Sequence, residues 1–160
     1  VFHILKLDYV MDKSSLVVSS PDDDQSAKRM SFNYNWMKML NANGNKSILA
    51  DLGYVSNKSD GKNNNYTKII LAATYSFPWS SKYNGSARMD FTDLKYPDND
   101  NLRKDTIYGV TIGATQDLKK NRNMGLSLSY LMNSSNVDSY KYNKMLLGFT
   151  YSFSGNYLRK

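Results

Sequence analysis

The chain has no cysteine, one histidine and no long apolar run. Without cysteine there is neither a disulfide framework nor a thiolate site. Because His3 is the only histidine, a histidine-based catalytic triad would have to use that residue. With a mean hydropathy of −0.58, no segment approaches the roughly 18–20 apolar residues of a membrane helix. A helical span is thereby excluded, whereas a membrane β-barrel is not, since its strands are apolar at only every second position.

The residues that are abundant favour strands and turns. Thirteen tyrosines and two tryptophans accompany many serines, threonines and asparagines, a composition typical of β-structure. A length of 160 residues gives room for one domain. The net charge of +7 is compatible with nucleic acid or with anionic lipid headgroups. The basic residues are dispersed rather than concentrated on one predicted sheet, so we expect no nucleic-acid partner.

Apolar and polar residues alternate with a period of two along most of the chain. This pattern predicts nine strands, most of them about as long as a tilted membrane strand of roughly 9–11 residues. They span 3–10, 15–20, 28–39, 47–56, 66–77, 83–93, 105–116, 123–132 and 140–153. The connections between them alternate between short and long, as in bacterial outer-membrane barrels with periplasmic turns and longer external loops.

The direction of the last strand determines that of the others. If the strand at 140–153 begins at a long external loop, it ends on the periplasmic side. Because successive strands alternate in direction, the first of nine strands, at 3–10, then also runs inward from the outside. Bacterial single-chain barrels have an even strand number and periplasmic termini. We therefore expect 1–153 to be a barrel domain or the C-terminal portion of one, followed by a short tail at 154–160. Two alternatives are a miscount of one strand and an eight-stranded barrel whose first segment is not a membrane strand.

The two faces of the predicted strands differ in polarity. The polar face is expected to line a lumen, with the candidates Arg29, Asn33, Asn35, Asp51, Lys68, Arg88, Asp90, Thr111, Ser127, Ser129 and Lys144. On the apolar face, aromatic side chains gather beside the short turns and the end of the last strand. Rings with one apolar and one wet side favour the membrane interface. The predicted aromatic girdle comprises Tyr34, Trp36, Tyr75, Phe77, Trp79, Tyr151 and Phe153.

No motif points to catalysis or to a bound cofactor. The sequence has no glycine-rich phosphate loop and no zinc-ligand spacing. The run Asp22, Asp23 and Asp24 offers the carboxylates that calcium prefers, but carboxylate runs in external loops are more often solvated. We expect no enzymatic activity, no cofactor and no metal.

The stretch 143–153, NKMLLGFTYSF, resembles the C-terminal signal that the barrel-assembly machinery reads in outer-membrane proteins. In that signal, a glycine is followed at fixed spacing by two outward hydrophobic or aromatic residues. Gly148, Tyr151 and Phe153 fit the pattern. Leu146 stands where the family often has a polar residue, and the chain continues beyond Phe153, where the family usually stops.

A longer resemblance covers 103–153. This segment is similar to the last four strands of barrels fused to tetratricopeptide domains, such as the surface lipoprotein assembly modifier family. The shared features are Arg103 and Asp105, then Ser135 and Asn136, then Tyr140 and Tyr142. The resemblance implies an export or translocation role at the outer membrane and an upstream portion of the chain; it transfers no catalytic residue.

Together these features predict an all-β, antiparallel, up-and-down transmembrane β-barrel of about eight or nine visible strands in the bacterial outer membrane. The expected function is a channel or an export conduit. The expected partners are outer-membrane lipid, the barrel-assembly machinery, and an upstream segment or partner subunits that complete the wall. Two alternatives remain open: an anchoring barrel with partner-binding external loops, and a soluble β-sandwich or calycin-like binding protein.

Overall fold

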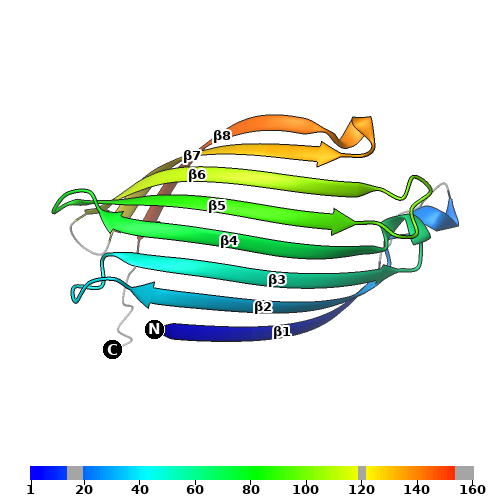
Figure 1. The fold of residues 1–160 in the computed structure, drawn as a ribbon, viewed down its shortest axis with the longest axis horizontal. Coiled ribbons are helices and arrows are strands. Elements are labelled where there is room, and N and C mark those ends of the chain that lie inside the picture. Colours follow the sequence, from blue (N-terminus) through cyan, green and yellow to red (C-terminus); the bar gives the residue numbers. More distant parts are fainter. Residues whose placement is uncertain (14–19, 119–121, 154–160) are drawn as a thin grey trace, which may run out of the picture.

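The structure is a computed structural model that describes residues 1–13, 20–118 and 122–153. Its strands form one antiparallel sheet in the order of the chain, so each strand pairs with its sequence neighbours (Figure 1). They are β1 (Phe2–Asp12), β2 (Ala27–Met39), β3 (Ser47–Ser59), β4 (Tyr66–Pro78), β5 (Tyr83–Lys95), β6 (Lys104–Leu118), β7 (Arg122–Ser135) and β8 (Tyr142–Phe153). The predicted all-β, antiparallel, up-and-down architecture is confirmed.

The described loops contain three short 3-10 turns: η1 (Pro21–Asp23), η2 (Lys62–Asn64) and η3 (Asp138–Tyr140). Within the described ranges, no helix has the length and apolar character needed to cross a membrane.

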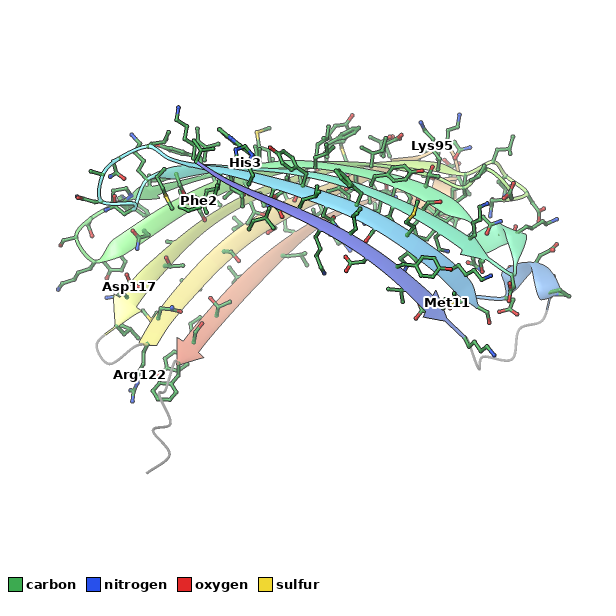
Figure 2. All side chains as sticks on the ribbon, turned by 90° about the horizontal axis from the view of Figure 1, so that it is seen from below. Phe2, His3, Met11, Lys95, Asp117 and Arg122 are labelled. Atoms are coloured by element: carbon green, nitrogen blue, oxygen red, sulfur yellow. The ribbon has the colours of Figure 1, made fainter. Side chains whose placement is uncertain are left out.

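The sheet is open rather than closed into the predicted barrel. Closure requires the first and last strands to pair, and in the described residues β1 pairs only with β2 and β8 only with β7. Figure 2 shows the sheet bent into an arch. The bend does not bring the two edge strands together, so both keep an unpaired edge in this structure.

The direction of the first strand corrects the sequence-based deduction. β1 pairs directly with β2, from Phe2 opposite Met37 to Asp12 opposite Ala27. The predicted strand at 15–20 lies outside the described residues except for Ser20, which caps η1. Because β1 is antiparallel to its neighbour β2, it begins at the end of the sheet where β8 finishes (Figure 1). The prediction that 3–10 runs inward from the side of the long loops is therefore wrong.

The two ends of the sheet differ in their connections. The turn end carries the connections 40–46 and 79–82 and the end of β8. The loop end carries 60–65, 96–103, 136–141 and the described part of the β1–β2 connection, with all three 3-10 turns (Figure 1). The connections thus alternate between ends along the chain, as the sequence predicts for 28–153.

The described sheet is a single layer without a hydrophobic core. Its only buried hydrophobic residues are Ala27 and Ala72, each 9% exposed, whereas Leu7, Met89 and Leu147 are 69%, 68% and 79% exposed. A sheet with one apolar face normally buries that face against another layer. The apolar face of this sheet is therefore left uncovered by the described residues.

Candidate functional site

The register of the sheet assigns every strand residue to one of two faces. His3 and Lys95 stand on the convex side of the arch (Figure 2). Direct cross-strand partners share a face, as do residues two apart along a strand. All eleven predicted lumen residues fall on the opposite, concave face; for example, Arg88 is opposite Thr111, and Thr111 is opposite Ser129. The period-two alternation of the sequence thus assigned these eleven residues to the same face as the structure does.

A polar network crosses the middle of the concave face from β2 to β5. Arg88 Nη1 lies 2.9 Å from Asp51 Oδ2 and 3.2 Å from Thr74 Oγ1, while Arg88 Nε donates to Asp90 Oδ1 at 3.3 Å. Asn35 Nδ2 donates to the other Asp51 oxygen at 2.7 Å. Asp51 and Arg88 belong to β3 and β5, so the ion pair spans the intervening strand β4.

The concave face leaves room for this network by using small residues. A Cβ added at Gly109 would lie 1.7 Å from Asp90 Oδ2, so glycine is the residue that lets the carboxylate rest against β6. Beyond Gly109, Thr111 Oγ1 and Ser129 Oγ lie within hydrogen-bond distance at 2.8 Å. The network and this pair together place polar side chains on the concave face from β2 to β7.

The other predicted lumen residues lie away from the central network. Arg29 donates to Asp12 Oδ2 at 3.2 Å near the loop end, a partner that the sequence prediction missed. Lys144 Nζ lies 4.5 Å from the ring centroid of Tyr142. Asn33, Lys68 and Ser127 share the concave face by register. Charges of both signs on this face suit an aqueous surface more than a packed core.

An arginine between two tyrosines marks the concave side of the loop end. The Arg103 guanidinium lies 3.4 Å from the ring centroid of Tyr140 and 4.4 Å from that of Tyr96. Arg103 Nε donates to Asp105 at 2.8 Å, and Asp105 is 1% exposed. Burial raises the pKa of Tyr96, although the positive charge of Arg103 partly opposes this shift. Arg103 thus fastens the 96–103 loop to the 136–141 loop.

Hydrogen bonds and ion pairs link all four connections at the loop end; we call these linked connections the loop rim. Lys62 pairs with Asp22 at 3.0 Å and with Asp100 at 3.1 Å, and its hydrogen bonds to these carboxylates raise its pKa. Asn65 Nδ2 donates to Asp98 at 2.8 Å. The Asn136 side chain donates to the carbonyl of Asn101.

A small polar pocket lies between the loop rim and the concave face. Its volume is about 190 Å³, and it is lined by Gln25, Ala27, Arg29, Asn57, Asn64, Tyr66 and Tyr96. The rings of Tyr66 and Tyr96 are 5.7 Å apart. Sequence alternation did not find this pocket, because its walls come from three separate connections and their adjoining strands.

The convex face carries the predicted girdle. Tyr34, Trp36, Tyr75, Phe77, Tyr151 and Phe153 all lie on this face by register. Trp36, Phe77 and Phe153 approach the turn end, and Trp79, in the connection 79–82, is 71% exposed. A hollow of about 560 Å³ borders Trp36, Leu71 and Met89. The register thus places six of these residues on one face, with Tyr34 opposite Leu5 and Leu52 and farther from the turn end than Trp36. The aromatic girdle itself stays a prediction.

The remaining candidates for chemistry are dispersed. His3 Nδ1 lies 2.7 Å from the Tyr34 hydroxyl on the exposed convex face. Asp22 pairs with Lys62, and Asp23 accepts a hydrogen bond from Asn63. In the part of the chain that the structure describes, no three metal-ligating side chains gather into a cluster.

Comparison of the chain with protein-family models, curated proteins and solved structures finds no match.

Proposed function

We propose that this chain forms part of the wall of a transmembrane β-barrel in the bacterial outer membrane, and that the barrel is a channel or an export conduit. In this proposal the convex face contacts lipid and the concave face lines the passage. An upstream segment or partner subunits pair with the free edges of β1 and β8, because lipid offers no hydrogen-bonding partner to an unpaired edge. The resemblance of 103–153 to tetratricopeptide-linked export barrels supports the export role.

The observation that carries the proposal is the continuous exposed apolar surface on the convex face. It extends across all eight strands, from Leu5 and Leu7 on β1 to Leu147 and Phe149 on β8. Apolar patches on soluble monomers rarely exceed a few hundred Å², so this surface supports contact with lipid.

Strand length also supports a membrane wall. β2, β3, β4 and β5 each have 13 residues. At about 3.3 Å per residue and a tilt near 45°, such a strand crosses roughly 30 Å, the thickness of a bilayer hydrocarbon core. Ordinary globular strands are shorter, at about five or six residues.

Detergent dependence tests the membrane assignment. We expect the full chain to remain monodisperse only with detergent or lipid, and to aggregate on detergent removal, as measured by size-exclusion chromatography with light scattering. A monodisperse chain without detergent would support the soluble β-sandwich or calycin-like alternative and contradict the proposal.

Conductance in planar bilayers tests the passage. A conduit lined by the Asp51–Arg88 network should give discrete current steps, and Arg88→Gln should change the ion selectivity by removing one positive charge from the lumen.

The loop rim favours a second candidate, an anchoring barrel whose linked external loops bind a partner. Efficient insertion without conductance would support that candidate over the channel.

A further inference from the structure

Charged residues are distributed differently on the two faces of the described strands. Those on the concave face include both signs in similar number: Lys6, Asp8, Asp12, Arg29, Asp51, Lys68, Arg88, Asp90, Asp105, Asp117 and Lys144. Those on the convex face lie near strand ends and include a single acid: Lys28, Lys38, Lys58, Asp93, Lys95, Lys104 and Arg122. The convex face therefore has an apolar centre and basic margins.

The loop-end margin contains two pairs of lysines in direct cross-strand opposition. Lys28 on β2 is opposite Lys58 on β3, and Lys95 on β5 is opposite Lys104 on β6. All four side chains are exposed. Like charges directly opposite each other destabilise a sheet, because their Cβ atoms are only about 4.5–5.5 Å apart. Two such pairs at one margin are costly unless an anion lies between the ammonium groups.

We propose that these lysine pairs bind the phosphate groups of anionic lipid headgroups. The inference rests on the proposed function, since it requires the convex face to contact a bilayer. Two lysine side chains on directly opposed residues can both direct their ammonium groups toward the oxygens of one phosphate, and the negative charge of the phosphate offsets their mutual repulsion. The occupant is a lipid because the apolar surface begins within two to four residues of the pairs. Beside the first pair, Met30, two residues from Lys28, is 56% exposed, and Tyr54, four residues from Lys58, is 40% exposed. Beside the second pair, Tyr108, four residues from Lys104, is 47% exposed.

The geometry suits a headgroup at the membrane surface. Lysine side chains at the margin of an apolar surface extend their ammonium groups toward the headgroup region while their methylene stems stay on the apolar side. An anionic surface attracts each nearby lysine. The Lys38 and Arg122 positions at the turn end lack this opposition, because Lys38 is opposite Ile48 and Arg122 is opposite Phe153.

The two pairs are expected to differ in affinity. Lys95 Nζ lies 3.0 Å from Asp93 Oδ2, so a carboxylate of the chain already neutralises part of that pair. In the described residues, Lys28 and Lys58 have no ion-pair partner. The Lys28–Lys58 pair is therefore the stronger phosphate site.

Native mass spectrometry of the full chain in micelles tests the proposal, with phosphatidylglycerol, phosphatidylcholine and inorganic phosphate as separate probes. We expect preferential binding of phosphatidylglycerol. The double variant Lys28→Gln with Lys58→Gln should weaken that binding about thirtyfold, and Lys95→Gln with Lys104→Gln should weaken it less. The matched control, Lys68→Gln with Lys144→Gln on the concave face, removes the same charge and should leave the affinity unchanged.

Three results would overturn the lipid site: equal binding of both lipids, undiminished binding by the Lys28 and Lys58 variant, or an equal loss in the concave control. If inorganic phosphate bound as tightly as phosphatidylglycerol, the acyl chains of the lipid would contribute nothing to the affinity. That result would also contradict the proposed lipid site. A folding readout provides a second check, because Lys28→Gln should raise the melting temperature in neutral micelles by removing the repulsion. The amount of detergent bound to the chain in the same spectra tests the membrane assignment separately. Failure of the membrane assignment can therefore be distinguished from failure of the lipid site.

Discussion

Leu71 and Ile70 are neighbours on β4 that face opposite sides of the sheet. Leu71 is 45% exposed on the convex face, whereas Ile70 lies opposite Gly53 on the concave face. We predict that Leu71→Arg impairs membrane insertion by about 2–4 kcal/mol if the residue lies near the bilayer midplane. Ile70→Arg, which adds the same charge one residue away, should be tolerated better because its side chain enters the polar interior.

The measurement is the fraction of each variant that inserts into lipid vesicles, determined by protection from protease. Equal insertion of Leu71→Arg and wild type would contradict the assignment of the convex face to lipid. Equal impairment by both arginines would contradict the distinction between the two faces.

Tyr96 gives the loop rim a pH dependence. Because burial raises the pKa of this phenol in the folded chain, the folded state retains the proton that the unfolded state releases. The stabilisation is therefore complete below the ordinary tyrosine pKa of about 10 and is lost as the pH rises through the higher folded value.

We expect the difference between the ultraviolet titrations of the wild type and Tyr96→Phe to show one phenolate that forms above the ordinary tyrosine pKa of about 10. Tyr96→Phe should remove this late step and leave the others unchanged. A titration curve of identical shape for the variant and the wild type would contradict the assignment.

Among the elements, the β1–β2 and β3–β4 connections are in backbone contact at Gly61. A Cβ added there would lie 2.4 Å from the Asp24 nitrogen and 2.6 Å from the Asp22 carbonyl oxygen. Since neither backbone atom can move aside freely, Gly61→Ala should destabilise the fold by about 1–3 kcal/mol and separate the two loops.

Amide hydrogen exchange checks this prediction. The Asp60 amide, which donates to the Ser26 carbonyl at 2.8 Å, should exchange faster in Gly61→Ala. The control Gly44→Ala changes a turn-end glycine that has no atom within 4 Å of the added Cβ, although its φ of 69° strains an alanine. Because this strain lies in the 40–46 turn, the control should leave the exchange of Asp60 unchanged. Unaltered exchange in both variants would contradict the contact.

The strands could be predicted because alternation records which side of a sheet each residue faces. The segment 66–77 is predicted to be a strand because Ile69, Leu71 and Ala73 alternate with the polar Lys68 and Thr74. The observed strand β4 spans Tyr66–Pro78. The same alternation cannot say which strands pair. The deduced direction of β1 was wrong because it assumed that a strand at 15–20 lies between β1 and β2, whereas β1 pairs directly with β2.

The loop rim could not be predicted from alternation. Arg103 and Tyr140 are far apart in the sequence, and their contact depends on β6 and β7 bringing two separate loops to the same end. The neighbouring Asp105 does carry a local signal, since an ionisable residue at the start of a strand requires a partner when it is buried. Its partner Arg103, two residues earlier, is a candidate in the sequence only because of the resemblance to the export barrels.

For the whole molecule, the free edges of β1 and β8 make a measurable prediction. If further strands complete the wall in a membrane, the outward amides of both edge strands should be as protected from hydrogen exchange as those of β4 and β5. If the sheet remains open, the edge amides should exchange rapidly while the central strands stay protected. Rapid exchange at both edges in a lipid-inserted sample would contradict completion of the wall.

The loop rim has a mechanical consequence. At the loop end, side-chain hydrogen bonds and ion pairs join each connection to the next, from Asp22 through Lys62 and Asp100 to Asn136. At the turn end, no hydrogen bond joins one turn to another within the described residues. The described loops are therefore cross-linked more than the described turns. If the sheet forms the proposed conduit, we expect changes in its curvature to begin at the turn end.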